Sequence, residues 1–252
     1  MSLNSNKELD QMLDQFLSTL KHSYSTCSLA SPRNKCVSFL RSTHYLEQLP
    51  SSAIPGITDL VLIVPRDLSI SAPEGVSLYR TDNVDLLFTL YNNYARSAED
   101  PSQLDVFGKN VNIHPSAIVG AEGLSIATYG SKRIQFKHCG RVIIEDNVHI
   151  GPYSVVQRGR LDDTLIGAGT MISSLCTIGH NSLIGKNCTI AIHAAISGSV
   201  RIGNNCWIGI GAMIRNNVTI CDDVTIGVGA VVVKDILQPG TYAGNPCRLL
   251  YH

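Results

Sequence analysis

Charge is scarce in this chain, and neither sign is in excess. Only 16% of the 252 residues are charged, and 20 lysines and arginines balance 20 aspartates and glutamates. A protein that binds nucleic acid through its phosphates needs a basic surface, so this balance argues against that role. Soluble chains average about 25% charged residues. Surface hidden inside an oligomer would explain the shortage.

Long apolar runs and paired cysteines are also missing. No apolar stretch approaches the roughly 20 residues of a membrane span, and the polar N-terminus does not read as a signal peptide. The eight cysteines include no Cys-x-x-Cys pair, so neither a disulfide framework nor a zinc site is expected. We therefore expect a cytoplasmic protein in a reducing compartment, with no metal and no bound cofactor.

The abundant feature is an aliphatic residue at every sixth position over 166–232. Neither the 3.6-residue period of a helix nor the two-residue period of a single strand produces this spacing. A hexapeptide repeat is the signature of a parallel β-helix, in which each hexad makes one short strand and one corner. The aliphatic positions are Ile166, Ile172, Ile178, Ile184, Ile190, Ile196, Ile202, Ile208, Ile214, Ile220, Ile226 and Val232.

Three such hexads close one triangular coil, so residues 18 apart are expected to lie above one another. Successive coils stack at the ordinary strand spacing of about 4.8 Å. The isoleucines point inward, and Gly and Asn take the corners that need unusual backbone angles. Cys176, Cys188 and Cys206 occupy the small-residue position as core fillers. The predicted fold is mainly β, a parallel β-helix, with an all-β sandwich as the alternative.

A small α/β domain is expected over residues 1–97, followed by the β-helix over 98–252, with a linker near 97–104. Apolar residues recur at helical spacing in two segments of the first part, and short β-branched runs separate them. The expected elements are helices over 7–20 and 83–96, a short helix over 43–49, and strands over 37–40, 60–64 and 76–79.

The β-helix, which begins at Ile113, is interrupted twice. Residues 120–140 lack the repeat, and a long excursion from a solenoid is usually functional. The repeat returns at Ile144. Four extra residues then shift its register within 159–163, a segment that we call the slip, and the regular spacing begins at Ile166. The cations of the excursion are either contacts for nucleotide phosphates or solvated loop residues: Lys132, Arg133 and Lys137.

A solenoid of this type needs caps or an oligomer, because its open ends expose strand edges. Three triangular prisms packed side by side form a C3 trimer with a groove at each junction. We therefore predict a homotrimer.

The chemistry centres on His180, which takes an outward position of its hexad. One coil above it lies Gly198, and one coil below lie Asp162 and Asp163, after the four-residue slip is counted. An imidazole can act as a general base. A glycine N–H can hold an oxyanion, and a carboxylate can orient the imidazole. The alternatives are a solvated histidine and a simple turn at the two aspartates.

Several short motifs stand out in the segment 142–199 and in the first domain. They are Arg158-Gly159, Leu161-Asp162-Asp163-Thr164, Gly179-His180-Asn181, Ile196-Ser197-Gly198-Ser199, Val37-Ser38-Phe39-Leu40 and Tyr45-Leu46-Glu47-Gln48-Leu49. On these motifs the chain resembles the N-acyltransferases of lipid A biosynthesis (LpxD), which acylate a UDP-linked glucosamine. This resemblance implies the left-handed sense of coiling, His180 as the base and Gly198 as the oxyanion donor.

The resemblance also implies a substrate site. In that family the first domain stacks uracil between aromatic rings that correspond to Phe39 and Tyr45, although both could equally pack in a core. Ser42 stands where the family usually has asparagine. Arg158 and Asn181 lie in the shared motifs and are expected to contact the substrate.

The C-terminal end departs from that family. Up to His252 we expect no counterpart of the family's C-terminal helices, which help recruit acyl carrier protein. Residues 231–248 instead resemble hexapeptide sugar acetyltransferases that use acetyl-CoA. Asn217 falls where the family has a second histidine, and we assign it to the acyl-donor site. Lys234 and Arg248 could meet CoA phosphates or be solvated.

The expected function is transfer of a short acyl group from acetyl-CoA or another acyl-CoA to the amino group of a nucleotide-linked amino sugar. The alternative is LpxD-type transfer of a 3-hydroxyacyl chain from acyl carrier protein to UDP-glucosamine in lipid A synthesis. In both cases the thioester is a co-substrate.

Three other classes of β-helix protein fit less well. A γ-class carbonic anhydrase needs three histidines around zinc, but the spacing of His180 and His193 does not stack them. An ice-binding solenoid needs a flat ladder of threonines, and none is present. A nucleotidyltransferase needs a Gly-rich basic loop near the N-terminus, which is missing.

Overall fold

The computed structural model describes residues 2–20, 23–29, 32–40, 56–97 and 105–251. The chain divides into two compact units. The first comprises residues 1–99 with 124–137, and the second comprises residues 100–123 with 138–252. Within the described residues, neither helix combines the length and the apolar character needed to span a membrane.

The first unit is a small α/β fold built on four parallel strands in the order β1-β2-β3-β4. The most buried strand is β3, whose apolar run is covered on both faces, as a parallel sheet requires. The elements are α1 (Ser2–Leu17), β1 (Ser25–Thr26), β2 (Cys36–Phe39), β3 (Leu60–Pro65), β4 (Val76–Thr81) and α2 (Val84–Ala95).

These elements agree with the sequence-based expectations in two helices and three strands, although α1 begins and ends earlier than the segment 7–20 and β1 was not predicted. Asn83 caps α2, since its side-chain oxygen accepts a hydrogen bond from the N–H of Leu86 at 3.0 Å. The short helix expected over 43–49 lies outside the described residues.

The segment 120–140 contains a β-hairpin of β8 (Ile126–Tyr129) and β9 (Lys132–Gln135). The hairpin belongs to the first unit, although the residues that flank it along the chain, up to Gly123 and from His138 onward, belong to the second. Phe136 stacks on Phe88 of α2 with ring centroids 5.9 Å apart. Residues 124–137 of the excursion are therefore a structured part of the α/β unit, whereas both ends of the excursion stay with the β-helix, where the expected boundaries had placed the whole segment.

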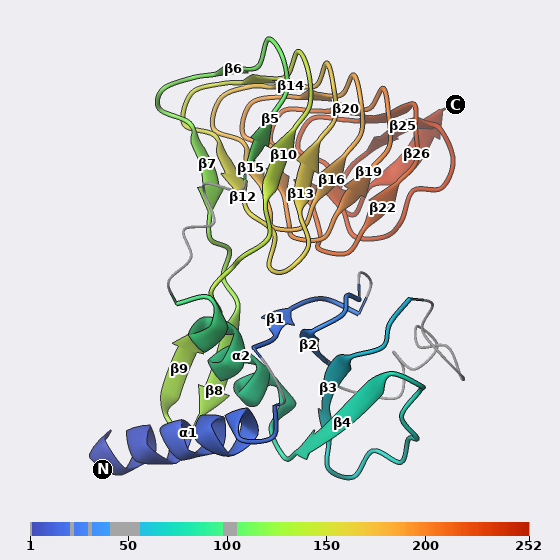
Figure 1. Ribbon diagram of the computed structural model, residues 1–252. Coiled ribbons are helices and arrows are strands. Elements are labelled where there is room, and N and C mark those ends of the chain that lie inside the picture. Colours follow the sequence, from blue (N-terminus) through green and yellow to red (C-terminus); the bar gives the residue numbers. More distant parts are fainter. Residues whose placement is uncertain (1, 21–22, 30–31, 41–55, 98–104, 252) are drawn as a thin grey trace. The chain divides into compact units, whose positions relative to one another are not determined.

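The second unit is a three-sided parallel β-helix whose strands stack in successive coils (Figure 1). Its first face contains β5 (Val106–Phe107), β10 (Val142–Ile144), β13 (Thr164–Ile166), β16 (Leu183–Ile184), β19 (Arg201–Ile202) and β22 (Thr219–Ile220). The second contains β6 (Asn112–Ile113), β11 (His149–Ile150), β14 (Met171–Ile172), β17 (Thr189–Ile190), β20 (Trp207–Ile208), β23 (Val224–Ile226), β25 (Gly240–Ala243) and β26 (Arg248–Tyr251). The third contains β7 (Ile118–Ala121), β12 (Val155–Gln157), β15 (Thr177–Ile178), β18 (Ala195–Ile196), β21 (Met213–Ile214) and β24 (Val231–Val232).

The register confirms the predicted coil of 18 residues. Ile166 pairs with Ile184, Ile172 with Ile190, and Ile178 with Ile196. The isoleucine columns are almost fully buried and form one continuous core with the cysteines at positions 176, 188 and 206. Each buried isoleucine contributes about 1.5–3 kcal/mol of hydrophobic stabilisation. All eight cysteines are free.

The β-helix begins one strand earlier than predicted. β5 already pairs with β10, so the first coil starts at Val106 and not at Ile113. Both residues of β5 are exposed, so this strand carries no inward-pointing aliphatic residue from which the repeat could be recognised. At the other end, β25 adds to the second face beside β23, and β26 pairs with β25 in the antiparallel sense as the last strand of that face.

Both interruptions of the repeat fall on the same corner, between the third and the first face. We name it the third corner. The excursion 120–140 leaves it between β7 and β10, and the four-residue slip occupies it between β12 and β13. The register across the slip runs from Ile144 to Ile166, which confirms the four extra residues. The next coil places His180 on this corner, between β15 and β16.

Candidate active site

His180 and Gly198 lie on successive coils of the third corner. The N–H of Ser199 donates to the carbonyl oxygen of His180 at 2.8 Å. A Cβ on Gly198 would lie 2.7 Å from Nε2 of His180. The ring therefore occupies the space that any side chain at position 198 would need. The predicted vertical stacking of these two residues is confirmed.

The side chain of Asn181 determines which ring nitrogen of His180 carries the proton. Its Oδ1 accepts from the N–H of Arg160 at 2.9 Å, and its Nδ2 donates to the carbonyl of Asp162 at 2.8 Å. These backbone partners leave the amide only one orientation. The same Oδ1 lies 2.9 Å from Nδ1 of His180. Since that oxygen can only accept, Nδ1 of His180 carries a proton, and in the neutral ring Nε2 has a free lone pair beside Gly198.

The expectation that Asp162 or Asp163 orients the imidazole by its carboxylate is wrong. The carboxylate of Asp163 forms an ion pair with Arg141 at 2.7 Å and accepts from its backbone N–H. Asp162 contributes its backbone carbonyl to Asn181. The slip therefore supports the amide of Asn181, and the amide orients His180. Asn181 was expected to contact substrate, whereas its side chain is bonded within the protein.

The expectation that Arg158 contacts the substrate is also contradicted by the structure. Its side chain is only 3% exposed and pairs with Asp105 at 3.1 Å. The guanidinium donates to the carbonyls of Gly120 and Gly140 at 2.8 and 3.1 Å. These glycines are the first and last residues of the excursion. Arg158 therefore holds the two ends of the excursion together by hydrogen bonds, and its buried charge is not available to a substrate.

Two further residues that were not predicted from the sequence lie at the site, His138 at the end of the excursion and Gln157 at the end of β12. His138 is fully buried, and its Nδ1 accepts from the N–H of Gly123 at 2.7 Å. Its ring stacks on that of His180, with centroids 5.3 Å apart. Gln157 Oε1 accepts from the N–H of His180 at 3.2 Å. In the sequence, the one feature that could have pointed to His138 is its position where the excursion returns to the β-helix.

Folding stability is expected to fall as the pH is lowered from about 6.5 towards 4. Burial, helped by the nearby His180 and Arg160, lowers the pKa of His138 to about 4. The unfolded chain therefore binds one more proton than the folded one within this window, which favours unfolding as the pH drops. Compared with a His138→Phe variant, the unsubstituted protein should lose at most about 1.4 kcal/mol per pH unit. Urea titrations across pH 4–7 measure this, and a constant difference between the two proteins would contradict it.

The predicted uracil site belongs to the first unit. Phe39 is half-buried at the end of β2, and its ring lies 4.5 Å from that of Phe88. Phe88 in turn stacks on Phe136, so the three rings form one aromatic row. Ser42 and Tyr45 lie outside the described residues. A base-stacking role for Phe39 stays a prediction.

The predicted acyl-donor residues are all exposed. Asn217 lies on the third corner one coil beyond Gly198, and its N–H donates to the carbonyl of Gly198. Lys234 lies in the same corner of the following coil. Arg248 begins β26 at the end of the second face and donates to the carbonyl of Cys247. The structure therefore brings Asn217 and Lys234 to the corner of His180 and Gly198, with Arg248 on another face.

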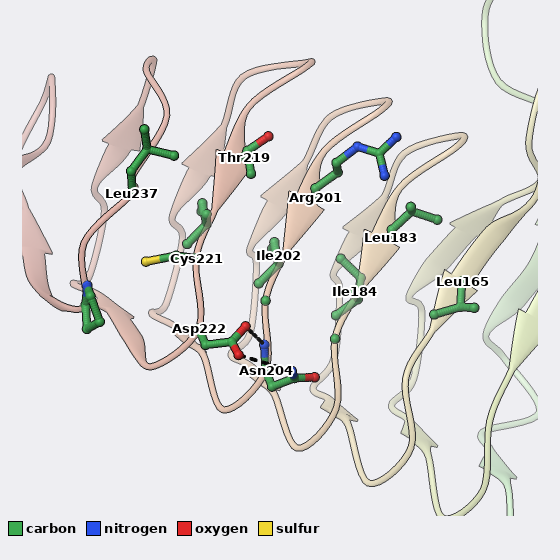
Figure 2. A pocket seen from close by; sticks show the side chains of 14 residues that line it. Leu165, Leu183, Ile184, Arg201, Ile202, Asn204, Thr219, Cys221, Asp222 and Leu237 are labelled. Atoms are coloured by element: carbon green, nitrogen blue, oxygen red, sulfur yellow. Dashed lines mark hydrogen bonds between the residues drawn. The ribbon is translucent and has the colours of Figure 1, made fainter. Parts of the chain in front are cut away.

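A shallow hollow of about 590 Å³ lies on the first face, which begins directly after the third corner. Figure 2 shows Leu165, Leu183, Arg201 and Thr219 following one another on successive strands. Asp222 accepts from the backbone and side chain of Asn204 and stiffens the edge of the hollow. The hollow thus offers apolar surface with one cationic side chain.

His193, considered above as a partner for His180 in a zinc site, lies on another corner. It separates β17 from β18, between the second and the third face. The two histidines are therefore not stacked, which agrees with the expectation from their spacing.

Two family profiles match the β-helix. The profile for bacterial transferase hexapeptide (six repeats) matches residues 199–234, and that for the hexapeptide repeat of succinyl-transferase matches residues 176–193. The chain is 49% identical over 78 residues to a UDP-3-O-acylglucosamine N-acyltransferase of Sinorhizobium fredii. It is 42% identical over 76 residues to one of Idiomarina loihiensis. Each match covers 30% of this chain and 22% of the relative.

The chain thus matches about a fifth of the length of these curated relatives. Among solved structures, a crystal structure of a UDP-N-acetylglucosamine acyltransferase aligns with 90% of this chain and 70% of its own, at 15% identity and a TM-score of 0.51. At that identity the likeness concerns the fold alone. Together with the hexad register and the stacked coils, these matches show that residues 176–234 carry hexapeptide repeats of the kind found in bacterial transferases.

Proposed function

We propose that this protein is an N-acyltransferase. It moves a short acyl group from a CoA thioester to the amino group of a nucleotide-linked amino sugar. One observation carries the proposal: His180 turns an unprotonated Nε2 to the backbone of Gly198 on the next coil, with its tautomer held by Asn181. The named relatives, which are N-acyltransferases, support this choice of reaction.

The reaction needs no covalent enzyme intermediate. Nε2 of His180 takes a proton from the substrate amine while the amine nitrogen attacks the thioester carbonyl carbon. The N–H of Gly198 stabilises the oxyanion of the tetrahedral intermediate. When the intermediate collapses, the carbon–sulfur bond breaks, and the imidazolium returns the proton to the leaving thiolate. The products are an amide and a free thiol.

The acyl donor is proposed to lie along the third corner, beyond Gly198. Asn217 and Lys234 follow on the next coils of that corner and are exposed. Three coil spacings of about 4.8 Å place Lys234 about 14 Å from the coil of His180. An extended pantetheine arm covers such a distance, so Lys234 can meet a phosphate of CoA while the thioester reaches His180.

The working unit is proposed to be a homotrimer. Large apolar side chains are exposed on the second and third faces and on the corner between them, which is unusual for a monomer. They are Ile118, Tyr153, Met171, Leu175, Trp207, Ile210, Met213 and Val228. Light scattering that returned the mass of one chain would contradict this assembly.

The proposed activity is tested with purified protein, a panel of UDP- and dTDP-linked amino sugars, and acetyl-CoA beside longer acyl thioesters. Mass spectrometry reads the acylated sugar. We expect a product with at least one amino sugar and a short acyl-CoA. If no thioester acylates any amine in the panel, the proposal fails.

A second candidate is transfer of a 3-hydroxyacyl chain from acyl carrier protein to UDP-glucosamine. The 49% identity to a UDP-3-O-acylglucosamine N-acyltransferase favours it, although the match covers 22% of that protein. The leucines of the hollow on the first face offer apolar surface for a long chain. Turnover with acyl carrier protein and none with acyl-CoA would select this candidate.

Replacement of Phe39 by alanine is expected to raise KM for the nucleotide sugar roughly 10-fold with little change in kcat. Loss of one aromatic stacking partner for a base costs about 1–3 kcal/mol of binding. Initial-rate measurements at saturating thioester separate the two constants. Tyr94→Ala, which removes an exposed ring from the same unit, is the control. An unchanged KM for Phe39→Ala would remove Phe39 from the sugar-nucleotide site.

A further inference from the structure

His138 is a second histidine in direct contact with the proposed base, and nothing in the reaction above uses it. The chain returns from the excursion at this residue, since Lys137 ends the hairpin segment of the first unit and His138 resumes the second. The side chain of His138 is fully buried, so a substrate has no access to it. Any effect on the reaction must therefore pass through His180.

The hydrogen bond to Gly123 fixes the state of the His138 ring. A backbone N–H can only donate, so Nδ1 of His138 is the acceptor of the 2.7 Å bond and carries no proton. The proton of the neutral ring is on Nε2. Protonation of Nδ1 would break this bond within a buried site.

Gly123 also explains how the two rings come together. A Cβ at position 123 would lie 2.8 Å from Cδ2 of His180 and 2.9 Å from Cε1 of His138. Both rings therefore contact the same glycine. They stack with an interplanar angle of 27° and ring centroids 5.3 Å apart. A larger residue at position 123 would displace at least one of them.

The charged and titratable groups around His138 keep it neutral. Arg158 directly after β12, Arg160 in the slip and His180 on the next coil all act on it, and all three are basic. With burial, they lower the pKa of His138 to about 4. At neutral pH the ring that faces His180 is thus an uncharged aromatic surface.

We propose that His138 is a positioning residue, whose neutral ring holds the imidazole of His180 with Nδ1 towards Asn181 and Nε2 towards Gly198. The inference rests on the proposed function and adds a residue to it. When His180 takes the proton of the amine, the stacked ring also offers its face to the imidazolium, a cation–π contact. His138, at the end of the excursion, thereby contributes to the active site on the β-helix.

The test compares three variants of the full-length protein. His138→Ala should lower kcat roughly 10- to 100-fold with KM for the sugar unchanged, since a small displacement of a catalytic group costs about that much. His138→Phe keeps a neutral ring of similar shape and should recover activity to within about threefold. His149→Ala, which alters a half-buried histidine on the second face, should match the unsubstituted protein. Full activity of His138→Ala, or no rescue by phenylalanine in a folded protein, would overturn the proposal.

Nitrogen NMR of histidine-labelled protein supplies a readout that needs neither turnover nor a variant that folds. We expect His180 with its proton on Nδ1, and His138 with its proton on Nε2 and neutral down to about pH 5. A mixed tautomer of His180, or protonation of His138 near pH 6.5, would overturn the inference. If the protein acylates no amine, the proposed function fails, and these ring states still decide whether His138 positions His180.

Discussion

Replacement of His180 by alanine is expected to lower kcat by roughly 10²–10⁴, the range for loss of a general base. The neutral amine must lose a proton as its nitrogen attacks the thioester, and Nε2 of His180 is the acceptor on the third corner. Asn181 and Gly198 stay in place without the imidazole, because their backbone bonds belong to the coil. KM for both substrates should therefore change little.

The control for this variant is His149→Ala, which removes a histidine from the second face and should keep full kcat. Light scattering on both variants checks that assembly is intact. Near-normal turnover of His180→Ala would remove this histidine from the mechanism. The base would then have to be sought elsewhere.

Replacement of Arg158 by methionine is expected to destabilise the β-helix by about 3–5 kcal/mol. The ion pair of Arg158 and Asp105 is almost completely buried, with 3% and 5% of the two side chains exposed. Removal of one partner leaves a buried charge without compensation, which is the costly case. The variant also removes the hydrogen bonds to the carbonyls of Gly120 and Gly140, which hold the two ends of the excursion together. Denaturant unfolding, followed by the far-UV signal of the β-helix, measures the loss.

Arg141→Met is the matched control, because Arg141 also pairs with an aspartate on the third corner but is 45% exposed. An exposed pair contributes at most about 1 kcal/mol. A double variant, Arg158→Met with Asp105→Leu, should recover part of the stability, since no isolated charge stays buried. A loss for Arg158→Met no larger than for Arg141→Met would show that the buried pair is not what holds the excursion.

The β-helix could be predicted from the sequence in detail, including which residues pair. Each hexad makes the same strand and the same corner, so the spacing of Ile166, Ile184 and Ile202 along the chain is also their register in space. The same regularity predicts that Gly198 lies against His180, as it does in the structure. A repeat converts sequence distance into spatial distance, which an ordinary globular chain does not do.

The prediction failed where the repeat is broken. Within the slip, counting residues could not show whether a side chain or the backbone of Asp162 would face His180, and the backbone carbonyl proved to be the group in use. Arg158 looked like a substrate contact because its motif is shared with a known family, but the folded chain buries it against Asp105.

The sequence by itself thus determined the three-sided β-helix, its core and the column of His180 and Gly198. Only the tertiary structure decided what surrounds that column. It brought His138 and Gly123 from the two ends of the excursion, and it showed that an amide orients the base. The physical reason is that the repeat dictates contacts one coil apart, whereas the excursion and the slip meet this corner through turns and buried polar bonds that have no period.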